Sequence, residues 1–310
     1  MLAAGRFHIV TGKGGVGKTT VATALAMAEA RAGKEVLLAE AHGRDQVATM
    51  LGVRPVGPNM REVLERLHVV DMTAEEAIHE YALLTLRFEA LYRAVFQNRF
   101  VRSFLRLIPS LGELVMLGKL WYHEQEQREG RARFDAVVLD APATGHALSM
   151  LRTPKAVEQT VPRGPLRNNA RDIGELLSDA QRTRLHVVTI PEEMAVNEAR
   201  RLGAAARDEL QVALGWTFLN ETVAPVPPPV LEALAGHRAD GLVGSVHQAL
   251  KLREDKREQG ELQLEALPGN MLANAVRLPR LVGYATDRER IEALAEHFVR
   301  QQLSAHEGLG

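Results

Sequence analysis

The chain of 310 residues contains no cysteine. Without thiols the protein forms no disulfide and has no thiolate ligands for zinc or for an iron–sulfur cluster. It also has no cysteine nucleophile. Aromatic residues are scarce as well, at 5% of the chain. The chemistry of the protein must therefore rest on oxygen and nitrogen groups and on the backbone.

Long apolar runs and an excess of charge are also missing. No stretch of about 18 uncharged apolar residues occurs, and the N-terminal residues enter a short apolar segment without the features of a signal peptide. We expect a chain that does not span a membrane and that is cytoplasmic, which suits a sequence without disulfides. The 38 basic and 39 acidic residues give a net charge of −1, so no nucleic-acid partner is expected.

The strongest motif lies near the N-terminus, where an apolar run, a glycine-rich loop and a helix-forming segment follow one another. Residues 7–11 suit a buried parallel strand, and residues 21–30 favour a helix that stops by Gly33. Glycines let successive backbone amides point inward, and the helix N-terminus adds positive potential, so such a loop selects polyanions. The predicted nucleotide-binding residues are Gly12, Lys13, Gly14, Gly15, Val16, Gly17, Lys18, Thr19 and Thr20. A glycine turn that merely joins strand to helix is the alternative.

A second apolar run, residues 136–140, ends in a carboxylate. In phosphate-loop enzymes the corresponding acidic residue lies beside the metal at the carboxyl edge of the sheet. Lys18 is placed to reach the outer phosphates, and the Thr19 hydroxyl is placed to bind Mg²⁺. We therefore predict a magnesium site formed by Thr19 and Asp140.

The loop string GKGGVGKTT resembles the variant phosphate loop of the MinD, ParA and ArsA group of dimeric ATPases. In that group the early lysine, Lys13 here, reaches the nucleotide of the facing subunit. The resemblance implies ATP and Mg²⁺ as cofactors, a homodimer or a heterodimer with a related ATPase, and catalytic roles for Lys13 and Lys18. A solvated loop lysine is the alternative for Lys13.

Residues 140–148, DAPATGHAL, followed by Leu151 and Pro154, are more specific. They are similar to the switch segment of ArsA and of the eukaryotic tail-anchored-protein targeting ATPases, although the proline is displaced by one position. Residues 189–192, 216–220 and 276–279 resemble further segments of the targeting ATPases in the same order. By this resemblance Asn220 recognises adenine, and Leu278 and Pro279 belong to a loop that flanks the base. As an isolated signal, an Asn at a strand end is usually a turn residue.

The chain departs from these families where they place a catalytic aspartate, just after the second strand. Counting from the strand at residues 36–39 puts His42 at that position, with Glu40 before it and Asp45 after it. Only with altered geometry could one of these residues orient the attacking water, so we expect slow hydrolysis. A structural role as the N-cap of a helix over residues 46–51 explains Asp45 equally well. The cysteines that bind zinc or arsenite in the families are absent.

We call residues 40–45, which follow the strand at residues 36–39, the first switch; between it and Asp140 the pattern becomes helical. Residues 73–76 form a capping box, and aromatic residues then recur at every fourth position from Phe88 to Phe104. Side chains four residues apart on a helix are rotated relative to one another about the helix axis. One flat partner face therefore cannot cover all the aromatic residues of this ladder. By resemblance the insertion forms a groove for a hydrophobic client helix; burial in the core and docking on anionic lipid are the alternatives.

We therefore predict an α/β fold with a doubly wound, mostly parallel sheet of the P-loop NTPase type and an inserted α-helical subdomain. Residues 1–72 and 131–310 form the nucleotide-binding domain, and residues 73–130 form the insertion. The predicted function is a dimeric Mg²⁺-dependent ATPase that opens and closes around a hydrophobic client. A weakly hydrolysing, nucleotide-gated interaction protein and a MinD- or ParA-like positioning ATPase are the alternatives. Membrane contact is expected to be indirect or transient.

Overall fold

The computed structural model describes residues 5–41, 44–78, 111–236 and 241–307, and an eight-stranded sheet forms its centre. The strand order is β10-β9-β8-β1-β7-β2-β4-β3, and each adjacent pair is parallel except the edge pair β3–β4. Its strands are β1 (Phe7–Gly12), β2 (Val36–Glu40), β3 (Arg61–Leu64), β4 (Leu67–Asp71), β7 (Ala136–Asp140), β8 (Thr183–Thr189), β9 (Leu214–Thr222) and β10 (Ala275–Pro279). A separate hairpin contains β5 (Gln127–Arg128) and β6 (Arg131–Ala132). The predicted fold class is confirmed.

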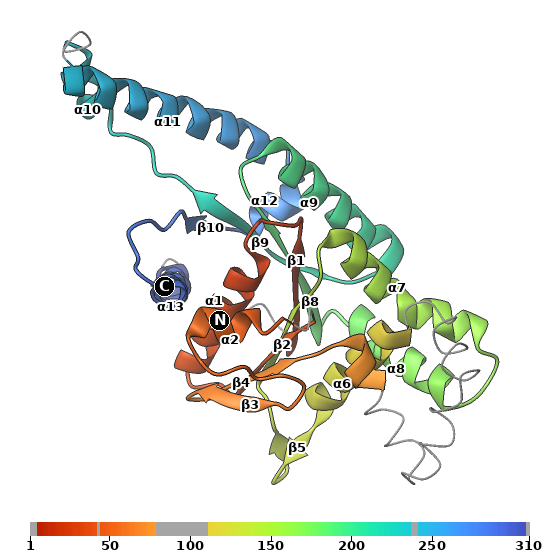
Figure 1. The fold of residues 1–310 in the computed structure, drawn as a ribbon. Coiled ribbons are helices and arrows are strands. Elements are labelled where there is room, and N and C mark those ends of the chain that lie inside the picture. Colours follow the sequence, from red (N-terminus) through yellow and green to blue (C-terminus); the bar gives the residue numbers. More distant parts are fainter. Residues whose placement is uncertain (1–4, 42–43, 79–110, 237–240, 308–310) are drawn as a thin grey trace.

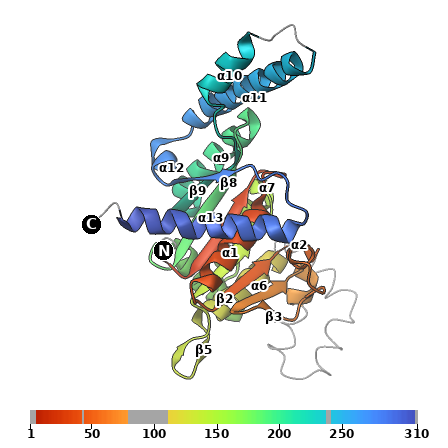
Figure 2. The same ribbon diagram turned by 90° about the vertical axis from the view of Figure 1, so that its left-hand side faces the viewer.

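Helices cover both faces of this sheet and make three layers (Figure 1, Figure 2). The helices of the structure are α1 (Lys18–Arg31), α2 (Gln46–Leu51), α6 (Leu111–Gln125), α7 (Thr144–Thr160), α8 (Pro165–Ser178), α9 (Glu193–Ala205), α10 (Pro228–Ala235), α11 (Gly241–Glu265), α12 (Gly269–Ala273) and α13 (Asp287–Glu307), with a short π-helical turn, η1 (Ala206–Leu210), after α9. One hydrophobic cluster contains side chains of α1, α2 and α13, and the other contains side chains of α6, α7, α8 and α9. Figure 1 shows α10 and α11 extending away from the sheet.

The sequence pattern explains why the central strands are buried on both faces. Successive side chains of a strand point to opposite faces, so a strand between two helical layers is mostly apolar on both faces. On β1, Ile9 belongs to one hydrophobic cluster and Val10 to the other. The last described helix, α13, has Ile291, Leu294 and Phe298 buried against the α1 layer. These two layers hold the end of β1 in a fixed position.

Two buried histidines lie side by side on β1 and β8. Nδ1 of His8 lies 3.1 Å from Nε2 of His186, and the Trp216 amide donates to Nδ1 of His186 over 2.9 Å. His186 must therefore carry its proton on Nε2 and donate it to His8. Burial lowers the pKa of His8 to about 4 and lowers that of His186 well below its usual value. Both rings are consequently neutral at pH 7.

The carboxyl ends of β1, β7, β2 and β4 meet at one edge of the sheet. These strands end at Gly12, Asp140, Glu40 and Asp71 respectively. β1 lies between β7 and β8, and the chain leaves it through α1 to continue on the far side of β7. Open parallel sheets bind ligands at such a switch in strand order, outside the carboxyl ends of the strands.

The predicted N-cap at Thr73 is confirmed, although the Thr73 hydroxyl and not the Thr73 amide donates to Glu76. The Glu76 amide donates to the Thr73 hydroxyl over 3.2 Å, and that hydroxyl donates to the Glu76 carboxylate over 2.7 Å. The aromatic ladder from Phe88 to Phe104 lies outside the described residues. Of the predicted insertion, α6 contributes Leu114 and Leu117 to the same cluster as the sheet residue Leu139. The division into two domains stays a prediction.

Candidate functional site

Two glycines give the loop after β1 its shape. Gly15 and Gly17 have φ angles of 87° and 85°, in the left-handed region that glycine adopts without a steric cost. A Cβ on Gly17 would also collide with the Asn220 side chain, whereas a Cβ on Gly14 would meet nothing within 4 Å. The loop thus turns tightly where it packs on β9 and is open at Gly14, as a phosphate cradle requires.

Thr19 and Asp140 meet beneath this loop. The Thr19 hydroxyl donates to Oδ2 of Asp140 over 2.7 Å, and Asp140 is fully buried. Burial raises the pKa of Asp140 to about 7, and repulsion from Glu40 adds to the rise, while Thr19 and Lys18 oppose it. A hydroxyl and a carboxylate are the hard oxygen donors that Mg²⁺ prefers. These two groups therefore fit an Mg²⁺ that also takes phosphate oxygens.

Lys18 is the cation of the site. Its ammonium group donates to the Lys13 carbonyl over 3.3 Å. Burial lowers the pKa of Lys18, and the nearby Asp140 charge opposes that shift. A partly desolvated ammonium group gains most from an anion that replaces its lost hydration. The arrangement therefore favours a bound phosphate next to Lys18.

A cavity of about 290 Å³ opens beside the loop. Its wall includes Gly17, Thr20, Asn220, Glu221, Pro279 and Arg280. Nδ2 of Asn220 donates to the Val16 carbonyl over 2.9 Å, so this side chain also ties β9 to the loop. Leu278 lies next to the cavity in the chain but has a fully buried side chain, and its carbonyl accepts a hydrogen bond from Thr222. The structure thus brings Asn220 and Pro279 to one cavity and places the Leu278 side chain in the core.

The first switch differs from the expected arrangement. His42 lies outside the described residues. Asp45 has the N-cap position of α2, but its side chain makes no capping hydrogen bond; one carboxylate oxygen instead accepts the amides of Val56 and Gly57 over 2.7 and 3.1 Å. Glu40 accepts the first amides of α2, so the predicted capping role of Asp45 passes to Glu40. The reason is that Asp45 is itself left-handed, with φ 48°, and directs its carboxylate at another loop.

Glu40 and Asp71 are site residues that motif analysis does not identify as a group. Glu40 is the register partner of both Asp140 on β7 and Asp71 on β4, so three carboxylates stand in a row across the sheet edge. Burial raises the pKa of Glu40, amides of α2 oppose the rise, and Asp71 and Asp45 add to it. The sequence indicates each of the three carboxylates separately, because each is the last residue of an apolar strand segment. The order of the strands is needed to bring the three together.

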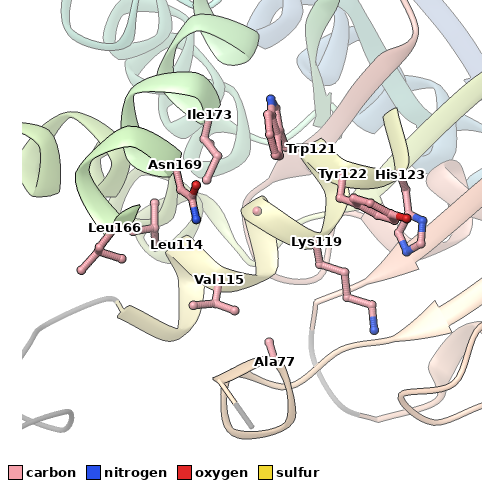
Figure 3. Close-up of a pocket in the computed structure, with 11 residues that line it drawn as sticks. Ala77, Leu114, Val115, Lys119, Trp121, Tyr122, His123, Leu166, Asn169 and Ile173 are labelled. Carbon is pink, nitrogen blue, oxygen red and sulfur yellow. The ribbon is translucent and has the colours of Figure 1, made fainter. Parts of the chain in front are cut away.

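An apolar pocket of about 460 Å³ lies on the α6–α8 side of the sheet. Figure 3 shows Leu114, Val115 and Trp121 of α6 on its wall together with Leu166 and Ile173 of α8. The Tyr122 side chain also lines the pocket and is 58% exposed. Exposed aromatic surface of this kind is typical of binding sites for apolar ligands. As to membrane spans, no helix in the described part of the chain has the length and apolar character to cross a bilayer.

Comparison with known proteins agrees with this geometry. Residues 5–165, just over half of the chain, match the family model of the anion-transporting ATPases. The ATPase BagA of Mycobacterium tuberculosis is 28% identical over 315 residues, which cover 97% of this chain and 84% of that protein. The arsenical pump-driving ATPase of Escherichia coli is 27% identical over 244 residues, which cover 73% of this chain and 37% of that protein. With its glycine loop, its Thr19–Asp140 pair and this match, the chain belongs to the anion-transporting (ArsA) ATPase family.

Proposed function

We propose that the protein is a dimeric Mg²⁺-dependent ATPase in which ATP binding and hydrolysis close and reopen two subunits around a hydrophobic client. The observation that carries the catalytic part is the Thr19–Asp140 contact beneath the glycine loop, next to the partly buried Lys18. A magnesium ion there would supply Lewis-acid stabilisation of charge on the phosphates. Thr19 would hold the ion and Asp140 would fix the Thr19 side chain.

The dimer and the cytoplasmic location are parts of this proposal. Lys13 has a half-buried side chain, and its carbonyl accepts the Lys18 ammonium group. We assign Lys13 the role of reaching the facing subunit's nucleotide. A ligand can bias opening and closing only if it binds one state more tightly, and a lysine contributed across the interface gives ATP that preference for the closed state.

The apolar pocket between α6 and α8 supports a hydrophobic client. Its wall combines apolar side chains with the half-exposed aromatic ring of Tyr122. The burial of an aromatic side chain contributes more binding free energy than that of most other residues. We therefore place part of the client contact here, where α6 of the predicted insertion packs beside α8.

Slow hydrolysis is the second candidate behaviour, and a specific observation favours it. Asp45, the aspartate nearest to the expected catalytic position, uses one carboxylate oxygen to bind the Val56 and Gly57 amides. A group held in this way is poorly placed to orient an attacking water. A weakly hydrolysing, nucleotide-gated binder, or one subunit of a heterodimer, would use the same pocket and the same loop.

Three measurements on the purified protein test the proposal. Phosphate release measures turnover, native mass with and without ATP and Mg²⁺ measures dimerisation, and crosslinking to a hydrophobic helical peptide measures client capture. We expect an ATP-dependent dimer that captures the peptide. Tyr122→Ser should weaken capture, whereas Tyr284→Ser, which replaces a 42% exposed tyrosine away from the pocket, should not. Equal capture by both variants, or a monomer at all nucleotide concentrations, would contradict the proposal.

A further inference from the structure

Glu40 lies between the magnesium end of β7 and the start of α2. It is the last residue of β2 and is fully buried. Its register partner on β7 is Asp140, which accepts the Thr19 hydroxyl. The next residue, Ala41, donates its amide to the Asp140 carbonyl over 3.3 Å. The backbone of this strand end is therefore fixed directly to the strand that carries Asp140.

The Glu40 side chain extends in the other direction, to α2. One carboxylate oxygen accepts the Gln46 amide over 3.1 Å, and the other accepts the Val47 amide over 3.0 Å. Bonds from backbone amides to a carboxylate are charge-assisted and are stronger than bonds between neutral groups. A six-residue helix such as α2 is too short to hold its first turn by itself. Its orientation consequently depends on Glu40.

A second carboxylate holds the residue before α2. Asp71, the register partner of Glu40 on β4, accepts the Asp45 amide over 2.9 Å, and the Glu40 carbonyl accepts the Met72 amide over 2.8 Å. Two neighbouring strand ends thus bind three successive amides, those of Asp45, Gln46 and Val47. A shift of β2 and β4 together relative to β7 would move all three amides.

We propose that Glu40 is a positioning residue for ATP turnover, which couples the magnesium end of β7 to the N-terminus of α2 and so sets where the first turn of α2 lies relative to Thr19 and Asp140. This inference rests on the ATPase function proposed above. Glu40 does not act as the base itself, because both of its carboxylate oxygens already accept backbone amides. It acts through the helix that it holds.

The experiment compares Glu40→Gln and Glu40→Ala with the wild-type chain. Gln keeps one acceptor oxygen and the shape of Glu, so it can hold one of the two amides, whereas Ala holds neither. We expect kcat to fall by about tenfold or more in Glu40→Ala, which corresponds to about 1.4 kcal/mol in the barrier. We expect a smaller fall in Glu40→Gln and a KM for ATP close to that of the wild type in both variants.

Asp135→Ala is the control. Oδ2 of Asp135 accepts the Glu35 amide over 2.9 Å, so it makes the same kind of bond at the opposite end of β2. Because Ala offers no acceptor oxygen, this replacement should lower stability without changing kcat. If Asp135→Ala lowers kcat as much as Glu40→Ala at equal loss of melting temperature, Glu40 has only a structural role.

A second readout needs no turnover. Arg44 is exposed just before α2, so trypsin cleavage after Arg44 reports the state of this segment. We expect Mg²⁺ with a non-hydrolysable ATP analogue to change the cleavage rate in the wild type and to leave it unchanged in Glu40→Ala. An equal nucleotide effect in both proteins, or none in the wild type, would overturn the coupling. A wild type that shows the effect but releases no phosphate would refute the hydrolysis and leave the coupling standing.

Discussion

Replacement of Gly17 by Ala tests the shape of the phosphate loop. Gly17 has φ 85° and ψ 28°, and a Cβ at this position would collide with Nδ2 of Asn220. A left-handed conformation costs an L-residue about 1–2 kcal/mol. Displacement of Asn220 also breaks its hydrogen bond to the Val16 carbonyl, and a buried group left without its partner costs about 1–3 kcal/mol. We expect Gly17→Ala to lose about 2–5 kcal/mol of unfolding free energy.

Gly14→Ala is the comparison, because its Cβ meets nothing within 4 Å and its φ is not positive. Urea unfolding should show a change within about 0.5 kcal/mol for this variant. Calorimetric titration with ATP and Mg²⁺ should show weaker binding in both variants, since the Gly14 methyl group would extend into the space for the phosphates. A Gly17→Ala protein as stable as the wild type would refute the loop geometry, and a Gly14→Ala protein with unchanged affinity would refute the placement of the phosphates.

Three further predictions concern single side chains. Lys18→Ala should lose ATP binding and keep its melting temperature, because burial already disfavours the Lys18 charge, as its lowered pKa indicates. Calorimetry measures the binding and thermal unfolding measures the melting temperature. Retained ATP affinity would contradict the role of Lys18. The low pKa of about 4 for His8 means that the unfolded chain binds a proton that the folded chain rejects, so the contribution of neutral His8 to stability is complete above pH 6.5 and is lost toward pH 4. The slope should be about 1.4 kcal/mol per pH unit for each buried histidine, and it should be shallower in His8→Gln; identical slopes would count against this explanation. Asp45→Ala should lower the unfolding free energy by about 1–3 kcal/mol through the Val56 and Gly57 amides, while Arg54→Ala, an exposed neighbour, should leave it unchanged in urea unfolding.

Much of the fold follows from local patterns in the sequence. The apolar run before Gly12 predicts β1, the glycine loop predicts the turn into α1, and the apolar run that ends at Asp140 predicts β7, because buried parallel strands and helix starts have strong local signals. The N-cap at Thr73 and the apolar face of α13 are local signals of the same kind.

The first switch could not be predicted in this way. The side chain of Asp45 binds amides eleven and twelve residues further along the chain, and Glu40 takes over the cap of α2. Both contacts depend on how β2, β4 and the following loops pack. The row of Asp71, Glu40 and Asp140 likewise depends on the strand order β7-β2-β4, which no local pattern contains. The roles of Lys13, Asn220, Pro279 and the aromatic ladder stay predictions.

The central claim is that the loop from Gly12 to Thr20 binds ATP with Mg²⁺ through inward-facing amides, Lys18 and Thr19. The most direct test is a calorimetric titration of the wild-type chain with ATP in the presence and absence of Mg²⁺. We predict saturable binding of one nucleotide per chain, tighter with Mg²⁺, and loss of that Mg²⁺ effect in Thr19→Ala. A titration without saturation, or an affinity that neither Mg²⁺ nor the Thr19 substitution changes, would contradict the claim.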